Sequence, residues 1–321
     1  MNIFIIGSGT FGTAIANELT ANIKNKVTIF SRSEEKKNEI NNFHTNKKYF
    51  PSKKLSNSLF CTNEYSDIQN AEVVFLALPS TSIIENVKFF SHYISCNQLV
   101  VNLSKGILSN GRTIIEFLKT ELRSDNLVSL KGPSFAIEIM NRAETVLTLG
   151  YSQEKQKETI FKIFNDTCIY LESTKDIKGV EILGVIKNIY AILLGIVDEK
   201  FTSPNSRFMV LSKVFAEIKI LNNLFKGDAQ TIFLACGIGD FCLTSFNKLS
   251  RNRTLGTQIG KGIYNSRKNN INIVEGVNSL KIIYYLIDSS TLKKLPLLNK
   301  LFLFFDSELN DMNIDLKKLY N

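Results

Sequence analysis

Short apolar runs recur throughout the first half of the chain, and stretches with helical spacing separate most of them. The runs cover residues 2–6, 27–30, 73–78, 99–103, 127–130, 146–149 and 168–171. Strands that alternate with helices predict a parallel sheet with crossover helices. Because most of these runs contain few polar residues, we expect the sheet to be buried on both faces.

The second half of the chain has a different pattern, since apolar residues from about Asp176 onward recur with helical spacing. Helices are predicted over residues 177–199, 206–224, 228–234, 237–246, 250–261, 273–288 and 296–305. We therefore predict two domains, an α/β domain over residues 1–175 and an all-helical domain over residues 176–321. With only five prolines in the chain, no proline-rich linker separates them.

The charge balance leaves two interpretations open. The 321 residues include 39 Lys and Arg against 30 Asp and Glu, a formal net charge of +9. This excess suits an anionic partner, and it equally suits a bias toward Lys, Asn and Ile without functional meaning. We expect no nucleic-acid partner, because the basic residues are spread along the chain and are not interleaved with aromatic residues.

Composition also bears on compartment and cofactor class. No apolar run reaches the roughly 18 residues of a membrane-spanning helix, and the N-terminus lacks the basic first segment of a secretory signal. The five cysteines form no C-x-x-C pair, and their odd number favours a reducing cytoplasm over a disulfide framework. Only two histidines are present, His44 and His92. We expect both at the surface and expect no metal site.

A glycine motif follows the first apolar run. Residues 7–12 read Gly-Ser-Gly-Thr-Phe-Gly, which fits G-x-G-x-x-G between a strand and a helix. In that context Gly7 permits the tight turn, Gly9 lets the backbone approach a pyrophosphate, and Gly12 allows close packing of helix on strand. Backbone N–H groups at the start of the helix then face the phosphates. The motif predicts a dinucleotide-binding domain.

The end of the second run favours NADP over NAD. A carboxylate is expected there for the ribose of NAD, but the chain reads Ser31, Arg32 and Ser33. The Arg32 guanidinium suits a 2′-phosphate, so NADP is the preferred cofactor. NAD stays open as the alternative, because Glu34 and Glu35 follow directly.

Seven further segments occur in fixed order along the chain. They are Leu78-Pro79-Ser80, Ser104-Lys105-Gly106, Gly132-Pro133-Ser134-Phe135-Ala136, Gly184-Val185-Ile186-Lys187-Asn188, Gly237-Ile238-Gly239-Asp240, Leu249-Ser250-Arg251-Asn252 and Val274-Glu275-Gly276. In this order and spacing the chain, from Met1 to about Asp288, resembles the NAD(P)-dependent glycerol-3-phosphate dehydrogenases of bacteria. The resemblance implies a Rossmann-like N-terminal domain with a parallel-rich sheet, an all-α C-terminal domain and a homodimer. It also implies reversible reduction of dihydroxyacetone phosphate to sn-glycerol 3-phosphate for phospholipid synthesis.

The resemblance also assigns roles to individual residues. The implied catalytic residues are Lys187, Lys105 and Asp240. The implied substrate-binding residues are Lys105, Gly132, Ser134, Lys187, Asn188, Asp240, Thr244, Ser250, Arg251 and Asn252. The implied cofactor-binding residues are Gly7, Ser8, Gly9, Thr10, Phe11, Gly12, Arg32, Lys105, Ala136, Arg251, Ile273 and Glu275.

The residue types suit this chemistry. Reduction of a ketone needs an acid for the developing alkoxide, and in a chain with two histidines a lysine is the available choice. Lys105 is expected to supply a second positive charge and to polarise the carbonyl. Arg251 offers a planar fork for phosphate oxygens, and Asn252 adds an amide donor. Sequence alone does not choose between Arg251 and Arg253 for the phosphate.

Each of these residues also has a structural alternative. Lys187 in an apolar helix is alternatively a residue that reaches the surface, and Asp240 is alternatively a helix N-cap. Two departures from the family pattern are visible: Phe11 stands where a Trp or Tyr is usual, and residues 199–205 lack the usual glycines. Two rival functions remain, a reductase of another 2-oxo or 2-hydroxy compound and a nucleotide sensor without turnover.

Overall fold

The computed structural model describes residues 1–264, 274–307, 312 and 314–319. The chain divides into two compact units. The first unit comprises Met1–Lys105 and Ile114–Val180, and the second comprises Gly106–Thr113 and Glu181–Asn321. Residues 106–113 thus cluster with the second unit, whereas the predicted division at residue 175 assigns them to the first.

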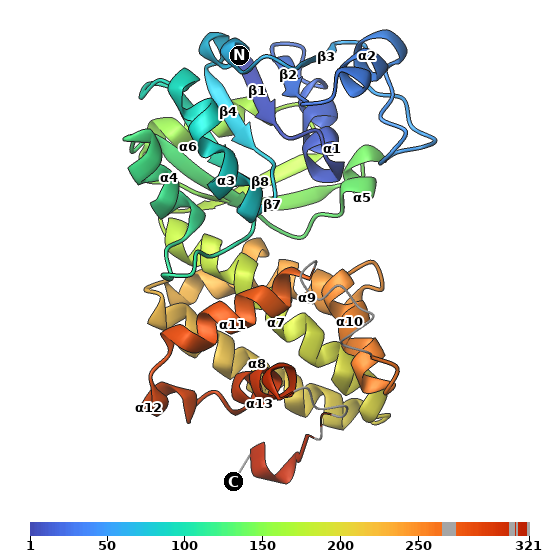
Figure 1. Cartoon of the computed structure of the whole chain (residues 1–321), viewed down its shortest axis with the longest axis vertical. Helices are drawn as coiled ribbons and strands as arrows, with labels where there is room; N and C mark the ends of the chain where they lie inside the picture. The colour runs from blue at the N-terminus through green and yellow to red at the C-terminus, as the bar shows by residue number, and fades with distance from the viewer. Residues whose placement is uncertain (265–273, 308–311, 313, 320–321) are drawn as a thin grey trace. The chain divides into compact units, whose positions relative to one another are not determined.

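The first unit is built on an eight-stranded sheet (Figure 1). Its strands are β1 (Asn2–Ile6), β2 (Lys26–Phe30), β3 (Leu59–Thr62), β4 (Val73–Leu76), β5 (Leu99–Asn102), β6 (Leu127–Lys131), β7 (Thr145–Gly150) and β8 (Ile169–Thr174). The sheet order is β3-β2-β1-β4-β5-β6-β7-β8, and all neighbours pair in parallel except β6 and β7. The predicted parallel-rich sheet is therefore confirmed, with one antiparallel pair.

Helices connect the strands of this unit. They are α1 (Thr10–Leu19), α2 (Glu34–Phe43), α3 (Ser80–Phe90), α4 (Ile114–Leu122), α5 (Ala136–Met140) and α6 (Glu154–Ile163), with short 3₁₀ helices at Tyr65–Asn70 and Ser91–Tyr93. Every residue of β4, β5 and β6 is buried, as expected for a sheet covered on both faces. The strand order reverses between β1 and β4, and ligands of open α/β sheets bind where the carboxyl ends of such strands meet.

From Glu181 onward, the described residues of the second unit form helices and the connections between them. Its helices are α7 (Ile177–Lys200), α8 (Pro204–Leu224), α9 (Asp240–Phe246), α10 (Arg251–Gly260), α11 (Glu275–Leu286), α12 (Ser289–Leu292) and α13 (Pro296–Asp306). The start of α7, up to Val180, clusters with the first unit. A 3₁₀ turn at Ala229–Phe233 and a π-helical turn at Ala235–Gly239 precede α9. The predicted 237–246 helix is therefore a π turn followed by a shorter α-helix.

Helix α7 forms the centre of this unit, with later helices around it in Figure 1. By length and composition it is apolar enough to cross a membrane, but its whole apolar window is buried inside the protein. It is therefore a core helix. Lys187 and Asn188 are the polar residues in the middle of this helix, and both are buried. A buried polar group must find hydrogen-bond partners, so we expect Lys187 and Asn188 to bond with polar side chains of neighbouring helices.

Candidate functional site

The glycine motif forms a tight turn between β1 and α1. Gly7 has φ +122°, and a Cβ there would lie 2.5 Å from the Ala77 carbonyl oxygen at the end of β4. A Cβ on Gly12 would lie 2.0 Å from the Gly7 oxygen. By contrast, a Cβ on Gly9 would meet no atom within 4 Å. The fold itself requires the first and third glycines, whereas the second keeps open a space beside the start of a helix, which suits a phosphate.

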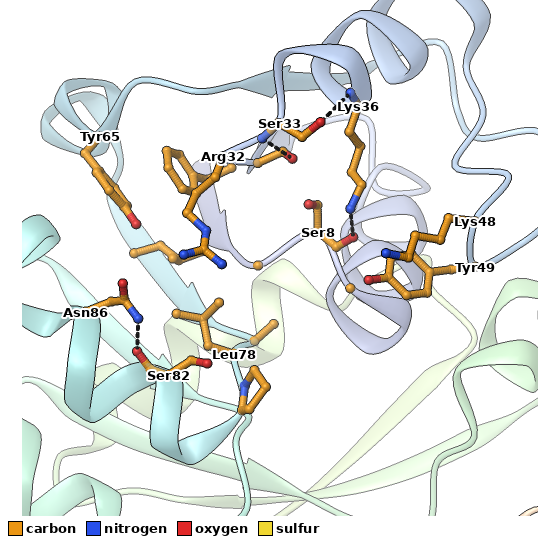
Figure 2. Close-up of a pocket in the computed structure, with 17 residues that line it drawn as sticks. Ser8, Arg32, Ser33, Lys36, Lys48, Tyr49, Tyr65, Leu78, Ser82 and Asn86 are labelled. Carbon is orange, nitrogen blue, oxygen red and sulfur yellow. Dashed lines mark hydrogen bonds between the residues drawn. The ribbon is translucent and has the colours of Figure 1, made fainter. Parts of the chain in front are cut away.

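A cavity of about 460 Å³ opens at this turn (Figure 2). Its walls come from the glycine turn, from the β2–α2 connection and from the end of β4. Figure 2 shows Arg32 and Lys36 extending into the same space. Burial raises the pKa of Tyr65 in the wall, and the nearby Arg32 opposes that shift. The Tyr65 ring stacks on Phe30 with centroids 4.0 Å apart.

The charged residues near this cavity differ in whether their side chains line it. The Glu34 carboxylate, at the start of α2, accepts from Lys37 Nζ at 2.9 Å and from Asn63 Nδ2 at 2.6 Å. Neither Glu34 nor Glu35 lines the cavity. Arg32 does line it, so the side chain that faces the expected ribose position is a cation.

Sequence reasoning missed several residues of this wall, among them Lys36, Lys48 and Tyr49. Lys36 donates to the Ser8 carbonyl oxygen at 3.5 Å, and its Nζ lies 5.0 Å from the centre of the Tyr49 ring. Lys48 Nζ approaches the same ring at 5.7 Å. The available signal was the position of Lys36 in the first turn of α2, where its backbone N–H is capped by Ser33. Lys48 and Tyr49 lie in the polar stretch after α2, where no pattern pointed to the cavity.

The centre of the second unit holds a buried ion pair. Lys187 Nζ lies 2.5 Å from Asp240 Oδ1 and donates to Thr244 Oγ1 at 2.6 Å. Lys187 is 6% exposed and Asp240 is 1% exposed. Lys187 therefore does not reach the surface, and Asp240 is not the N-cap of α9 because Gly239 holds that position. A π-helical turn precedes Asp240, and such turns are frequent at functional sites.

Beside this pair, amide groups link α7, α10 and α11. Asn188 Nδ2 donates to Glu275 Oε2 at 3.3 Å, and Asn252 Nδ2 donates to Asn188 Oδ1 at 3.0 Å. The Asn252 oxygen accepts from the Gly276 N–H at 3.0 Å. Three segments far apart in the sequence thus meet at one hydrogen-bonded cluster. Glycine makes the approach of α10 possible, because a Cβ on Gly256 would lie 1.9 Å from the Ile192 oxygen of α7.

The two arginines of α10 have different surroundings. Arg253 pairs with Asp198 of α7 at 2.8 Å, and Asp198 also pairs with Arg207 of α8 at 2.7 Å. Arg251 is exposed at the first position of α10, next to the buried Asn252. Ser250 caps this helix by accepting from the Arg253 N–H at 3.2 Å. Arg253 therefore holds helices together, and Arg251 is the arginine that remains available to a ligand.

The other residues named from the sequence lie as follows. Lys105, Gly132, Ser134 and Ala136 belong to the first unit, whereas Lys187 and its partners belong to the second. Lys105 is half-buried just after β5, and Ser134 Oγ donates to the Gly132 oxygen at 3.2 Å. Ile273 lies outside the described residues. His44 is half-buried at the end of α2, His92 is exposed, and the described residues contain no cluster of three potential metal ligands.

Comparison with protein families gives two matches that together cover most of the chain. Residues 2–157 match the family described as NAD-dependent glycerol-3-phosphate dehydrogenase N-terminus. Residues 176–310 match the family described as NAD-dependent glycerol-3-phosphate dehydrogenase C-terminus.

Individual relatives agree with the family matches. A protein of Methanothermobacter thermautotrophicus named glycerol-3-phosphate dehydrogenase [NAD(P)+] is 33% identical over 300 residues, covering 92% of each chain. One of Orientia tsutsugamushi with the same name is 32% identical, covering 88% of this chain and 87% of that one. The solved glycerol-3-phosphate dehydrogenase of Coxiella burnetii matches with a TM-score of 0.84 and 23% identity, over 99% of this chain and 97% of that chain. At that identity the solved structure supports the fold.

Proposed function

Because this chain belongs to the NAD-dependent glycerol-3-phosphate dehydrogenase family, we propose that it reversibly reduces dihydroxyacetone phosphate to sn-glycerol 3-phosphate. The chain is an oxidoreductase that uses a nicotinamide dinucleotide and acts on a CH–OH group. The observation that carries the proposal is the buried group of Lys187, Asp240 and Thr244. Such a group supplies a held proton donor at the centre of the helical unit.

The first unit fits the cofactor. The space above Gly9 receives the pyrophosphate, and the N-terminus of α1 faces it with N–H groups. Arg32 and Lys36 favour NADP over NAD, because both are cations beside the expected ribose position while Glu34 is held by Lys37 and Asn63. When bound, the cofactor supplies the hydride, and the protein supplies placement and charge.

In the direction of reduction, hydride reaches the ketone carbon while Lys187 Nζ gives a proton to the oxygen, and solvent then restores the proton to the lysine. Asp240 holds the ammonium in one direction and keeps a compensating charge beside it. Thr244 accepts a second hydrogen from Nζ, which fixes the position of the group further. In the reverse direction the same lysine receives the proton. Lys105 is proposed to supply a second positive charge that polarises the carbonyl, as the family resemblance implies.

Arg251 is proposed to bind the substrate phosphate. Its exposure at the start of α10 leaves its fork available, whereas Arg253 is paired with Asp198. Asn252 fixes the start of this helix through Asn188 and Gly276, and an amide carries a second N–H for the phosphate. A reductase of an unphosphorylated compound would not need this arrangement, and a nucleotide sensor would not need a buried acid.

The experiment that tests the function follows the absorbance of the reduced nicotinamide with purified protein. Dihydroxyacetone phosphate is supplied with NADPH and, separately, with NADH, and unphosphorylated dihydroxyacetone serves as the control substrate. We expect turnover of the phosphorylated ketone, with NADPH the better cofactor. Equal turnover of dihydroxyacetone would refute the proposed phosphate-binding site, and no turnover of either ketone would refute the proposed function.

The proposal extends to the setting of the enzyme. We expect it to act in the cytoplasm, which the scattered, odd-numbered cysteines favour. We also expect it to supply the glycerol phosphate of phospholipids and to form a homodimer, as the family resemblance implies. Light scattering of the purified protein tests the last of these.

A further inference from the structure

A lysine is buried at the carboxyl end of β6. Lys131 is only 2% exposed, although lysine is almost never fully buried without partners. Its Nζ donates to the Asn102 carbonyl oxygen of β5 at 2.9 Å and to Ser129 Oγ of its own strand at 2.8 Å. Asn102 and Ser129 are register partners of the two parallel strands. The lysine head thus joins β5 to β6 at the edge of the sheet that carries the proposed Lys105.

The bonds continue from Asn102 to the residue before Lys105. Asn102 Oδ1 accepts from the Ser104 N–H at 2.9 Å, and Asn102 Nδ2 donates to the Ser104 oxygen at 3.1 Å. Ser104 Oγ donates to the Leu78 oxygen after β4. Asn102 and Ser104 are both buried. Both the backbone N–H and the backbone oxygen of Ser104 are therefore hydrogen-bonded to Asn102, and Lys105 is the next residue in the chain.

Lys131 also precedes the second proposed substrate segment of this unit. Gly132 follows it directly, and a Cβ on Gly132 would lie 2.7 Å from the Val146 oxygen of β7. The backbone is therefore packed tightly against the next strand immediately after the lysine. The close packing of Gly132 limits movement on that side, so we expect a change at Lys131 to act mainly on Asn102, whose carbonyl oxygen the ammonium group bonds.

We propose that Lys131 is a positioning residue for the reaction, acting on Lys105 through Asn102 and Ser104. The inference rests on the role proposed for Lys105. Its physical basis is that misplacing a reacting group by about 1 Å can cost about a hundredfold in rate. A buried hydrogen-bond network with all partners satisfied also fixes one arrangement of the groups attached to it.

Lys131→Met tests this, because methionine fills a similar volume and removes the donor. We expect kcat with dihydroxyacetone phosphate to fall about tenfold to a hundredfold, while the Kd of NADPH, measured by its fluorescence, stays within about twofold. The matched control is Lys26→Met, which changes an exposed lysine of β2 in the same sheet and should leave kcat unchanged. An unchanged kcat in Lys131→Met overturns the proposal.

A double-mutant cycle separates positioning from general destabilisation. If Lys131 acts through Lys105, Lys131→Met costs little further kcat in a Lys105→Met background. A merely structural role gives the same fold loss in both backgrounds, and that result also overturns the proposal. Should Lys131→Met fail to fold, Lys131→Gln takes its place, because its amide nitrogen ends one bond short of the place of Nζ and cannot reproduce both bonds. We expect kcat to fall with unchanged NADPH binding, and wild-type kcat in that variant overturns the proposal as well.

The same set of proteins distinguishes this inference from the ones beneath it. Wild-type protein without turnover removes the proposed function. An active wild type with a fully active Lys105→Met variant removes the role of Lys105, and the role of Lys131 with it. A Lys105→Met variant that has lost activity, together with a fully active Lys131→Met variant, removes only the role of Lys131.

Discussion

Replacing Lys187 by methionine separates two consequences of the buried ion pair. Methionine keeps an unbranched apolar stem in the core and removes the ammonium. Asp240, which is 1% exposed, is then left without the cation that lies 2.5 Å away in the wild type. Removing one partner of a buried pair costs about 3–5 kcal/mol of unfolding free energy, because an uncompensated charge stays in the core. Loss of the proton donor separately lowers kcat by about a hundredfold to ten-thousandfold.

The double variant Lys187→Met with Asp240→Asn tells these effects apart. It removes the charge that the single variant leaves unpaired, so urea unfolding is expected to recover most of the lost stability. Its kcat with dihydroxyacetone phosphate is expected to stay as low as that of the single variant, since neither protein has the acid. NADPH fluorescence should report cofactor binding close to wild type in both, because the glycine turn belongs to the other unit.

The assay has two results that refute the reasoning. If Lys187→Met retains wild-type kcat, Lys187 is not the acid. If the double variant regains kcat along with stability, the loss in the single variant reflects misfolding of the site rather than missing chemistry.

The remaining predictions concern other charged groups. Arg251→Ala should raise the KM for the phosphorylated ketone by about tenfold to a hundredfold through loss of a charged hydrogen bond, whereas Arg253→Ala should mainly lower the melting temperature; the reverse pattern would exchange their roles. Replacing Arg32 or Lys36 by alanine should raise the KM for NADPH more than that for NADH, and equal losses would dispose of the 2′-phosphate assignment. Burial raises the pKa of Glu217 from its ordinary 4.5 to about 7, so the wild type should lose about 3 kcal/mol of stability as the pH rises from about 4.5 to about 7. Urea unfolding at about pH 5 and pH 8 should show most of that loss in the wild type and not in Glu217→Gln, and an equal loss in both would contradict the assignment.

The strands that sequence reasoning found are those whose apolar residues are continuous. The missed strand, β3, has four residues and lies at the edge of the sheet, where Phe60 is 55% exposed. Its apolar run covers only Leu59, Phe60 and Cys61, which is too short to stand out from a loop, whereas the other edge strand, β8, was found from the longer run at 168–171. The antiparallel pairing of β6 with β7 was also beyond the pattern, because apolar alternation reports burial and not strand direction.

Sequence reasoning likewise found some residues of the candidate site and missed others. The residue pattern pointed to Lys187, because Lys187 and Asn188 interrupt an apolar stretch, whereas Asp240 and Asn252 were assigned through the family resemblance. Neither the pattern nor the resemblance located Lys131, because a lysine after an apolar strand is typical of a surface turn. Nothing in the spacing of Arg251 and Arg253 separates them either. Their difference depends on Asp198, which lies 55 residues away from Arg253 in the sequence and meets it only in the folded helices.

The missing glycines of residues 199–205 have a physical explanation in the helices around them. Helix α7 continues to Lys200 and α8 begins at Pro204, so only three residues connect them, and proline at the first position of α8 is already preorganised for a helix. All seven residues are described, and none of them has a positive φ, so no glycine is needed for backbone reasons. The ion pair of Asp198 with Arg207 spans the connection and ties the end of α7 to the start of α8. Arg253 of α10 pairs with the same Asp198 carboxylate, so α10 is also tied to the end of α7. The absence of glycines at residues 199–205 therefore concerns only the connection between α7 and α8. The proposed phosphate-binding residue, Arg251, lies on α10, and the Arg253–Asp198 ion pair ties that helix to α7.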